Sequence, residues 1–134
     1  MSDDLEELKE TTRKTANLYF GDIPDAGGGY SLWRSFDKDL AREISIFYTA
    51  KLYAREKIPH RTRQLVAIAA LTVLARADEL RVHIWAGLNV GCTLEEIAEV
   101  IFQMGTYGGM PVLNEGLKIL KNVLEEREEV KKKT

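Results

Sequence analysis

A continuous apolar stretch in the middle of the chain constrains the fold more than any other feature. Residues 65–75 are all apolar except Thr72. The stretch is too short to cross a membrane as a helix, which takes about 20 residues, so we expect a buried helix from Arg61 to about Leu74. Apolar side chains cover nearly the whole circumference of that helix. A small domain has little interior to surround it, so we predict an oligomer in which a second subunit covers part of this helix.

The composition is that of one soluble globular domain. The chain has 134 residues, 45% hydrophobic and 30% charged, which fits a single domain spanning 1–134. Its formal net charge of −2 lacks the basic excess of nucleic-acid-binding proteins. The N-terminus has neither the basic start nor the apolar core of a signal peptide, and one cysteine, Cys92, cannot form an intrachain disulfide. We therefore predict a cytoplasmic protein that binds neither nucleic acid nor membrane.

The first half of the chain also has the apolar spacing of helices. An acidic amphipathic segment runs to about Leu18, and glycines with Pro24 predict a loop over 21–29. Asp37 is placed to cap a helix whose apolar residues follow at helical spacing. These residues are Leu40, Ile44, Phe47, Tyr48 and Leu52. No segment alternates as a strand does, so we predict an all-α fold with about six helices.

Three further helices are predicted in the second half of the chain. The first stops at Gly91. Thr93 and Glu96 have the spacing of a capping box, which starts the second. Glycines 108–109 end the second helix, and the proline that follows suits the first turn of the third. Residues 125–134 form a charged tail that we expect to fray.

Glu79 and His83 are the best candidates for a chemical site. They lie four residues apart on one predicted helix, so their side chains share a face. A carboxylate beside an imidazole can orient it, raise its pKa and share its proton near neutral pH. Gly87, one turn further along, leaves space for a ligand or for another helix. In the structural alternative, the helix dipole favours Glu79 and His83 is a half-buried packing residue.

Other polar residues have weaker support from the sequence. Arg63 could bind a substrate carboxylate in bidentate fashion, and Tyr107 could donate to an oxyanion, although both types are common at helix ends. We interpret Cys92 as a small core residue rather than a nucleophile. No zinc-ligand spacing is present, and the glycine cluster at 27–29 follows no strand, so it does not indicate a phosphate loop. We predict neither a metal nor a cofactor.

Taken together, these segments resemble the carboxymuconolactone decarboxylase family of the alkyl hydroperoxidase D-like superfamily. The resemblance covers residues 37–120 and rests on the order and spacing of several segments. These are 61–71 (RTRQLVAIAAL), 78–84 (DELRVHI), 86–97, 99–100 and 103–111. It implies the all-helical fold of the superfamily and assembly into trimers or hexamers. Residues 1–36, a helix plus the Gly-rich loop, match the family loosely at best.

The peroxidase branch of this superfamily carries a Cys-x-x-Cys-x-x-x-His motif and an upstream glutamate. When the histidine of the motif is placed on His83, its cysteines fall on Arg76 and Glu79 and the glutamate falls near Gln64. Disulfide-based peroxide reduction needs a thiolate and a resolving thiol. The missing cysteines therefore disfavour a thiol peroxidase.

The decarboxylase branch carries Glu and His at positions 79 and 83. The resemblance therefore implies a cofactor-free carboxy-lyase of aromatic compound catabolism, which converts 4-carboxymuconolactone to 3-oxoadipate enol-lactone and carbon dioxide. In this hypothesis Glu79 and His83 transfer the proton, Arg63 binds the anionic substrate and Tyr107 donates to the oxyanion. Two alternatives are a family member with another small-acid substrate and a non-catalytic oligomeric binding protein. An open pocket at Glu79 and His83 would favour an enzyme.

Overall fold

The computed structural model describes residues 2–25 and 29–133, and within these ranges its regular elements are all helical. They are α1 (Ser2–Phe20), α2 (Gly29–Phe36), α3 (Lys38–Ser45), η1 (Ile46–Tyr53), α4 (His60–Val73), α5 (Ala77–Asn89), α6 (Leu94–Gly108) and α7 (Met110–Lys133). The all-α prediction is confirmed. The seven described α-helices exceed the expected six because no apolar pattern predicted α2, and a π-helical segment, η1, follows α3.

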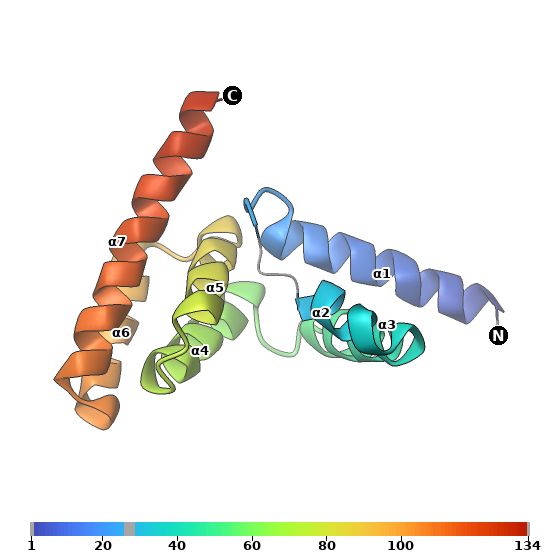
Figure 1. Ribbon diagram of the computed structural model, residues 1–134, viewed down its shortest axis with the longest axis horizontal. Coiled ribbons are helices and arrows are strands. Elements are labelled where there is room, and N and C mark those ends of the chain that lie inside the picture. The colour runs from blue at the N-terminus through green and yellow to red at the C-terminus, as the bar shows by residue number, and fades with distance from the viewer. Residues whose placement is uncertain (1, 26–28, 134) are drawn as a thin grey trace.

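The helices form two groups that α1 connects (Figure 1). One group contains α1, α2, α3 and η1, and the other contains α4 to α7. The α1 helix packs against both η1 and α5, whereas α2 packs mainly against α3. Residues 26–28 of the predicted loop lie outside the described residues, and Gly29 is already the first residue of α2.

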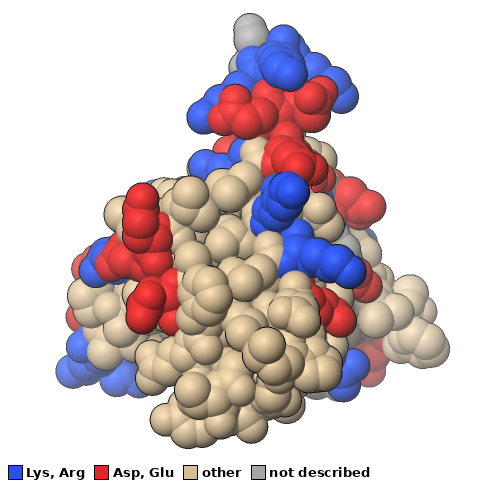
Figure 2. All heavy atoms as spheres, turned by 90° about the vertical axis from the view of Figure 1, so that its left-hand side faces the viewer, with Lys and Arg blue, Asp and Glu red and all other residues tan. Residues whose placement is uncertain are grey.

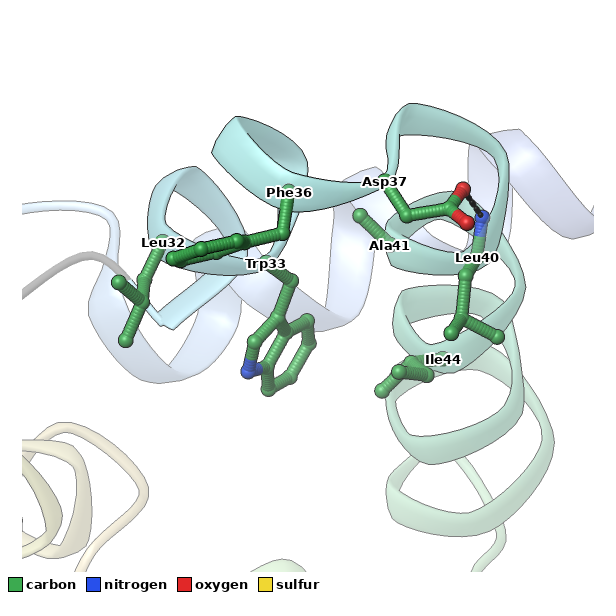
Figure 3. Close-up of a pocket in the computed structure, with 7 residues that line it drawn as sticks. All are labelled: Leu32, Trp33, Phe36, Asp37, Leu40, Ala41 and Ile44. Atoms are coloured by element: carbon green, nitrogen blue, oxygen red, sulfur yellow. Dashed lines mark hydrogen bonds between the residues drawn. The ribbon is translucent and has the colours of Figure 1, made fainter.

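Local signals in the sequence placed several helix ends correctly. The Asp37 side chain accepts a 3.0 Å hydrogen bond from the Leu40 amide at the start of α3 (Figure 3). Thr93 and Glu96 form the predicted capping box of α6. Gly91 follows α5 with a φ of +101°, a conformation that favours glycine. These ends depend on residues within one turn of each other, so they can be predicted without the rest of the fold.

The buried core lies within the second group of helices. Its members come from α4, α5, α6, α7 and the α5–α6 connection: Ile68, Leu80, Ile84, Trp85, Cys92, Ile97, Ile101, Leu120 and Val123. Gly116 lets α7 approach α4 and α6 closely, because a Cβ at this position would lie 2.8 Å from Ile101 Cγ2 and 3.2 Å from Thr72 Cγ2. Cys92 is buried in this core, as the sequence indicated.

The α4 helix is buried on one side only within a single chain. Gln64, Ile68 and Thr72 form its buried row. On another side Val66 is 59% exposed and Leu74 is 65% exposed, with Ala70 exposed between them. These three residues recur every four positions and form a continuous apolar stripe. The expected cover by a second subunit stays a prediction, and this stripe is the surface that such a subunit would bury.

The prediction that residues 125–134 fray is wrong for the part of the tail that the structure describes. The α7 helix continues to Lys133. Arg81 on α5 pairs with Glu126, and the Arg127 guanidinium lies 4.9 Å from the centre of the Trp85 ring. These contacts tie the start of the tail to α5. Beyond them the helix projects from the other helices (Figure 1), and charged residues gather at its projecting end (Figure 2). No helix of the described residues is long and apolar enough to cross a membrane.

The sequence segment after α1 is held against α5 by a carboxylate. Asp22 Oδ1 accepts hydrogen bonds from Trp85 Nε1 at 2.9 Å and from Asn89 Nδ2 at 2.8 Å. Asn89 Nδ2 also donates to the Tyr19 carbonyl oxygen at 2.9 Å. These bonds fix the end of α1 beside the last turns of α5, next to the part of the helix that carries the candidate site.

Replacing Gly116 by valine tests the close packing of α7. The first added carbon alone would sit 2.8 Å from the branched, stiff Ile101 side chain, so we expect Gly116→Val to lower the free energy of unfolding by about 2 kcal/mol. Urea denaturation at fixed protein concentration measures this loss. The control is Lys118→Val, at an exposed position of the same helix. Equal stabilities of the two variants would contradict the packing argument.

Candidate functional site

Glu79 and His83 line the same open hollow, which has a volume of about 830 Å³. Their side chains form part of its α5 wall, as the four-residue spacing predicted. Leu32 and Trp33 of α2 form an apolar part of the lining, and Glu126 of α7 contributes a carboxylate. Trp33 also lines a second, apolar hollow between α2 and α3 (Figure 3). Within one chain, Glu79 and His83 therefore border an open hollow rather than a closed contact between helices.

The His83 ring is held by groups from two other helices. Gln64 on α4 places its Oε1 atom 2.8 Å from His83 Nδ1. Phe20 of α1 packs against the ring nearly at right angles, with ring centroids 5.9 Å apart. Burial lowers the pKa of His83, and the neighbouring Glu79 carboxylate opposes this effect by raising it. Because burial dominates, the neutral imidazole is favoured near pH 7.

Gly87 brings α4 close enough for Gln64 to reach His83. A Cβ at position 87 would lie 3.3 Å from Ile68 Cδ1 and 3.5 Å from the Cβ of Gln64. Of the two uses expected for this glycine, the structure shows the second, because another helix occupies the space. Sequence reasoning missed Gln64 as a partner of His83. Its one signal was its position, which corresponds to the upstream glutamate of the peroxidase branch.

The charged residues of the hollow are mostly acidic. Asp25, Asp78, Glu79 and Glu126 line it together with one cation among the described lining residues, Arg81. Arg81 donates to both Glu126 carboxylate oxygens, at 2.9 and 2.7 Å, and to the carbonyl oxygens of Pro24 and Asp25. The Glu126 hydrogen bonds are the main cause of a raised pKa for Arg81. Arg81 therefore ties α5 to α7 and to residues 24–25, and in a single chain its charge is already paired.

The structure does not bring Arg63 or Tyr107 to this hollow within one chain. The Arg63 guanidinium donates to the Arg55 carbonyl oxygen, at 3.1 and 3.0 Å. Arg63 lines a different hollow, beside Val66 and other residues of α4. Tyr107 is 74% exposed near the end of α6. The roles assigned to these two residues stay predictions, and within one chain only Glu79 and His83 of the four candidates come together.

Cys92 lies apart from the lining of this hollow. It is buried, and its Sγ atom contacts the Arg61 carbonyl oxygen at 3.4 Å. Burial raises the pKa of the thiol, and the positive charge of Arg61 only partly offsets this. A buried thiol with a raised pKa forms little of the reactive thiolate, which agrees with a core role for Cys92.

Comparison with known proteins gives a family and two relatives. The family model described as "Carboxymuconolactone decarboxylase family" matches residues 38–122. The chain is 36% identical over 91 residues to the 4-carboxymuconolactone decarboxylase of Acinetobacter baylyi, and the match covers 68% of each protein. It is 40% identical over 81 residues to an uncharacterized 15.0 kDa protein from the nqo9–nqo10 intergenic region of Paracoccus denitrificans, which covers 59% of this chain and 60% of the relative.

The family match includes the central residues of the site and leaves part of its lining outside. Gln64, Glu79 and His83 all lie within residues 38–122, whereas Phe20 and Trp33 precede that range. The matched range covers more than half of the chain. This chain therefore belongs to the carboxymuconolactone decarboxylase family.

Proposed function

We propose that this protein is a cofactor-free carboxy-lyase that decarboxylates a small lactone acid by acid–base chemistry. The observation that carries the proposal is that Glu79 and His83 line one open hollow. The similarity to the decarboxylase of Acinetobacter baylyi supports 4-carboxymuconolactone as the first substrate to test. The proposal extends to a role in aromatic compound catabolism, which the similarity to that decarboxylase supports, and to the cytoplasmic location expected from the sequence.

In the proposed reaction the protein must donate one proton and stabilise the negative charge that develops on the lactone carbonyl oxygen. The bond between the ring carbon and the leaving carboxylate breaks, carbon dioxide departs, and the electron pair moves into the conjugated lactone carbonyl. The protonated form of His83 then gives its proton to carbon and regains one from solvent through the open hollow. Glu79 stabilises the imidazolium that forms between turnovers, since its carboxylate favours the charged ring.

Binding of the substrate requires an unpaired cation, and the described lining of the hollow offers none within one chain. The described lining is mostly acidic, and Arg81 is paired with Glu126. We retain Arg63 for the substrate carboxylate and Tyr107 for the oxyanion, which requires them to reach the hollow of a neighbouring subunit. Arg63 lies beside Val66, on the exposed stripe of α4. In this proposal the homo-oligomer, a trimer or hexamer, covers the stripe and completes the site.

The acidic lining favours one alternative. A family member whose substrate carries a single carboxylate would meet less repulsion from Asp78, Glu79 and Glu126 than a doubly charged lactone would. Small acids of that kind are the second set of substrates to test with the same purified protein.

The oligomer can be tested without a substrate. The chain has a mass of 15.2 kDa, so we expect light scattering to give three or six times this mass. Val66→Glu places a charge on the apolar stripe, where desolvation in a contact would be costly, and should shift the protein toward the monomer. The control is Asn122→Glu, at an exposed position of α7. A monomeric parent protein would overturn this part of the proposal.

The turnover of 4-carboxymuconolactone, followed spectrophotometrically, tests the reaction. We expect His83→Ala to reduce kcat/KM at least about a hundredfold, the lower limit for loss of a general acid. Glu79→Gln should reduce it less, because the ring remains in place. Glu99→Gln, an exposed carboxylate on α6, is the control. If the folded, oligomeric parent shows no turnover, the lactone is rejected as the substrate.

The pH dependence of turnover tests the role of His83 as the acid. The protonated ring is the donor, and burial places its pKa below the usual value of about 6.5. Thus kcat/KM should rise as the pH falls through that pKa. In Glu79→Gln the inflection should move to lower pH, because the carboxylate that raises the pKa is gone. An inflection that moves to higher pH would show that Glu79 does not stabilise the imidazolium.

A further inference from the structure

We propose that Tyr19 and His60 are positioning residues that act through Gln64 and hold His83 with its proton on Nδ1. The Nε2 atom of His83 is then the atom that exchanges protons in the hollow. This inference deepens the proposed function, on which its catalytic meaning rests, but the position of the proton can be measured without any substrate. Tyr19 precedes the range that matches the family model.

Two hydrogen-bonded pairs of polar side chains form a line from His83 toward the surface, with Gln64 and His60 one turn apart on α4. His83 Nδ1 lies 2.8 Å from Gln64 Oε1. One turn earlier on α4, His60 Nδ1 forms a short hydrogen bond with the hydroxyl of Tyr19. Gln64 is 0% exposed and Tyr19 is 1% exposed. The four side chains come from α1, α4 and α5, so tertiary packing assembles them.

At the surface end of this line, Glu56 determines which group donates each hydrogen bond and which accepts it. His60 Nε2 lies 3.8 Å from the Glu56 carboxylate. A carboxylate only accepts hydrogen bonds, so its charge favours a proton on that nitrogen. His60 Nδ1 is then the acceptor, and the Tyr19 hydroxyl donates to it. Burial raises the pKa of Tyr19, which keeps this donor protonated.

The orientation of the Gln64 amide then determines which nitrogen of His83 carries the proton. The Nε2 atom of Gln64 is buried and has no hydrogen-bond partner among the described residues. The Tyr19 oxygen can accept from this amide, because its lone pairs are available once the hydroxyl donates to His60. Gln64 also lowers the pKa of Tyr19, as a donor to that oxygen does. With Nε2 turned toward Tyr19, Oε1 faces His83. An amide oxygen only accepts, so His83 must donate from Nδ1.

This arrangement suits a group that gains and loses a proton in every turnover. When Nε2 of His83 takes up a proton, Nδ1 still carries its own and the bond to Gln64 Oε1 is unchanged. With the opposite tautomer, Gln64 would have to donate to Nδ1, and protonation of the ring would force the buried amide to turn over. The observed direction avoids that rearrangement, which lowers the cost of each cycle.

Nitrogen NMR of the two histidines tests the proposal directly. The chain has only His60 and His83, so protein labelled with ¹⁵N-histidine gives two ring systems, assigned with a His60→Ala variant. At a pH where the His83 ring is neutral, we expect parent His83 to show a protonated Nδ1 and an unprotonated Nε2. Tyr19→Phe, which keeps the ring and removes the hydroxyl, should give a mixture of both tautomers at His83.

Tyr53→Phe is the matched control, because Tyr53 packs against Tyr19 with ring centroids 5.9 Å apart and lies outside this line of hydrogen bonds. It should leave the His83 tautomer unchanged. Where turnover is found, Tyr19→Phe should lower kcat about two- to tenfold, the range for one lost hydrogen bond, without changing KM. A proton on Nε2 of neutral His83 in the parent would overturn the proposal, and so would identical tautomers in parent and Tyr19→Phe. If Tyr19→Phe does not fold, the His83 signals of the parent and of His60→Ala decide the question.

Discussion

The close packing of α4 against α5 and α7 is the constraint on which the rest of the structure depends. The buried row of α4 consists of Gln64, Ile68 and Thr72, spaced one turn apart. Two glycines leave room for this row to pack closely: Gly87 lies beside Ile68, and Gly116 lies beside Thr72. At this separation a polar residue in the buried row, Gln64, meets His83 directly. The geometry of the site therefore follows from the packing of the core.

Gln64 is the residue that most distinguishes this core from a purely structural one. Burying a primary amide is unfavourable unless hydrogen bonds replace those lost to water. The hydroxyl of the other polar residue in the row, Thr72, donates a hydrogen bond to the Ile68 carbonyl oxygen of its own helix at 2.7 Å. Gln64 has no such local solution, and its described bond runs to His83 on another helix. A buried amide of this kind stabilises the fold poorly but orients an imidazole well, which supports the positioning role proposed for it.

How much could be predicted from the sequence depends on how far apart the interacting residues lie in the chain. The capping box of Thr93 and Glu96 and the shared face of Glu79 and His83 follow from local helical spacing. The contact between Gln64 and His83 joins residues 19 apart, and it requires the helices to be packed first. The prediction that the charged tail frays was wrong for the same reason. The pair that anchors the start of the tail, Arg81 and Glu126, joins residues 45 apart.

Two features of the single chain support the proposed oligomer. An apolar stripe on α4 lies exposed, and a hollow with more carboxylates than free cations surrounds His83. A substrate with two negative charges would be repelled by that hollow, since its carboxylates outnumber its one described arginine, which is already paired with one of them. Arg63 lies next to Val66 on the exposed stripe and carries a guanidinium whose described hydrogen bonds reach a backbone carbonyl rather than a carboxylate. If a second subunit buries the stripe, it buries the surroundings of that guanidinium too. Assembly of the subunits would then both bury the apolar stripe and bring the Arg63 cation to the site. Binding of an anionic substrate would therefore depend on assembly.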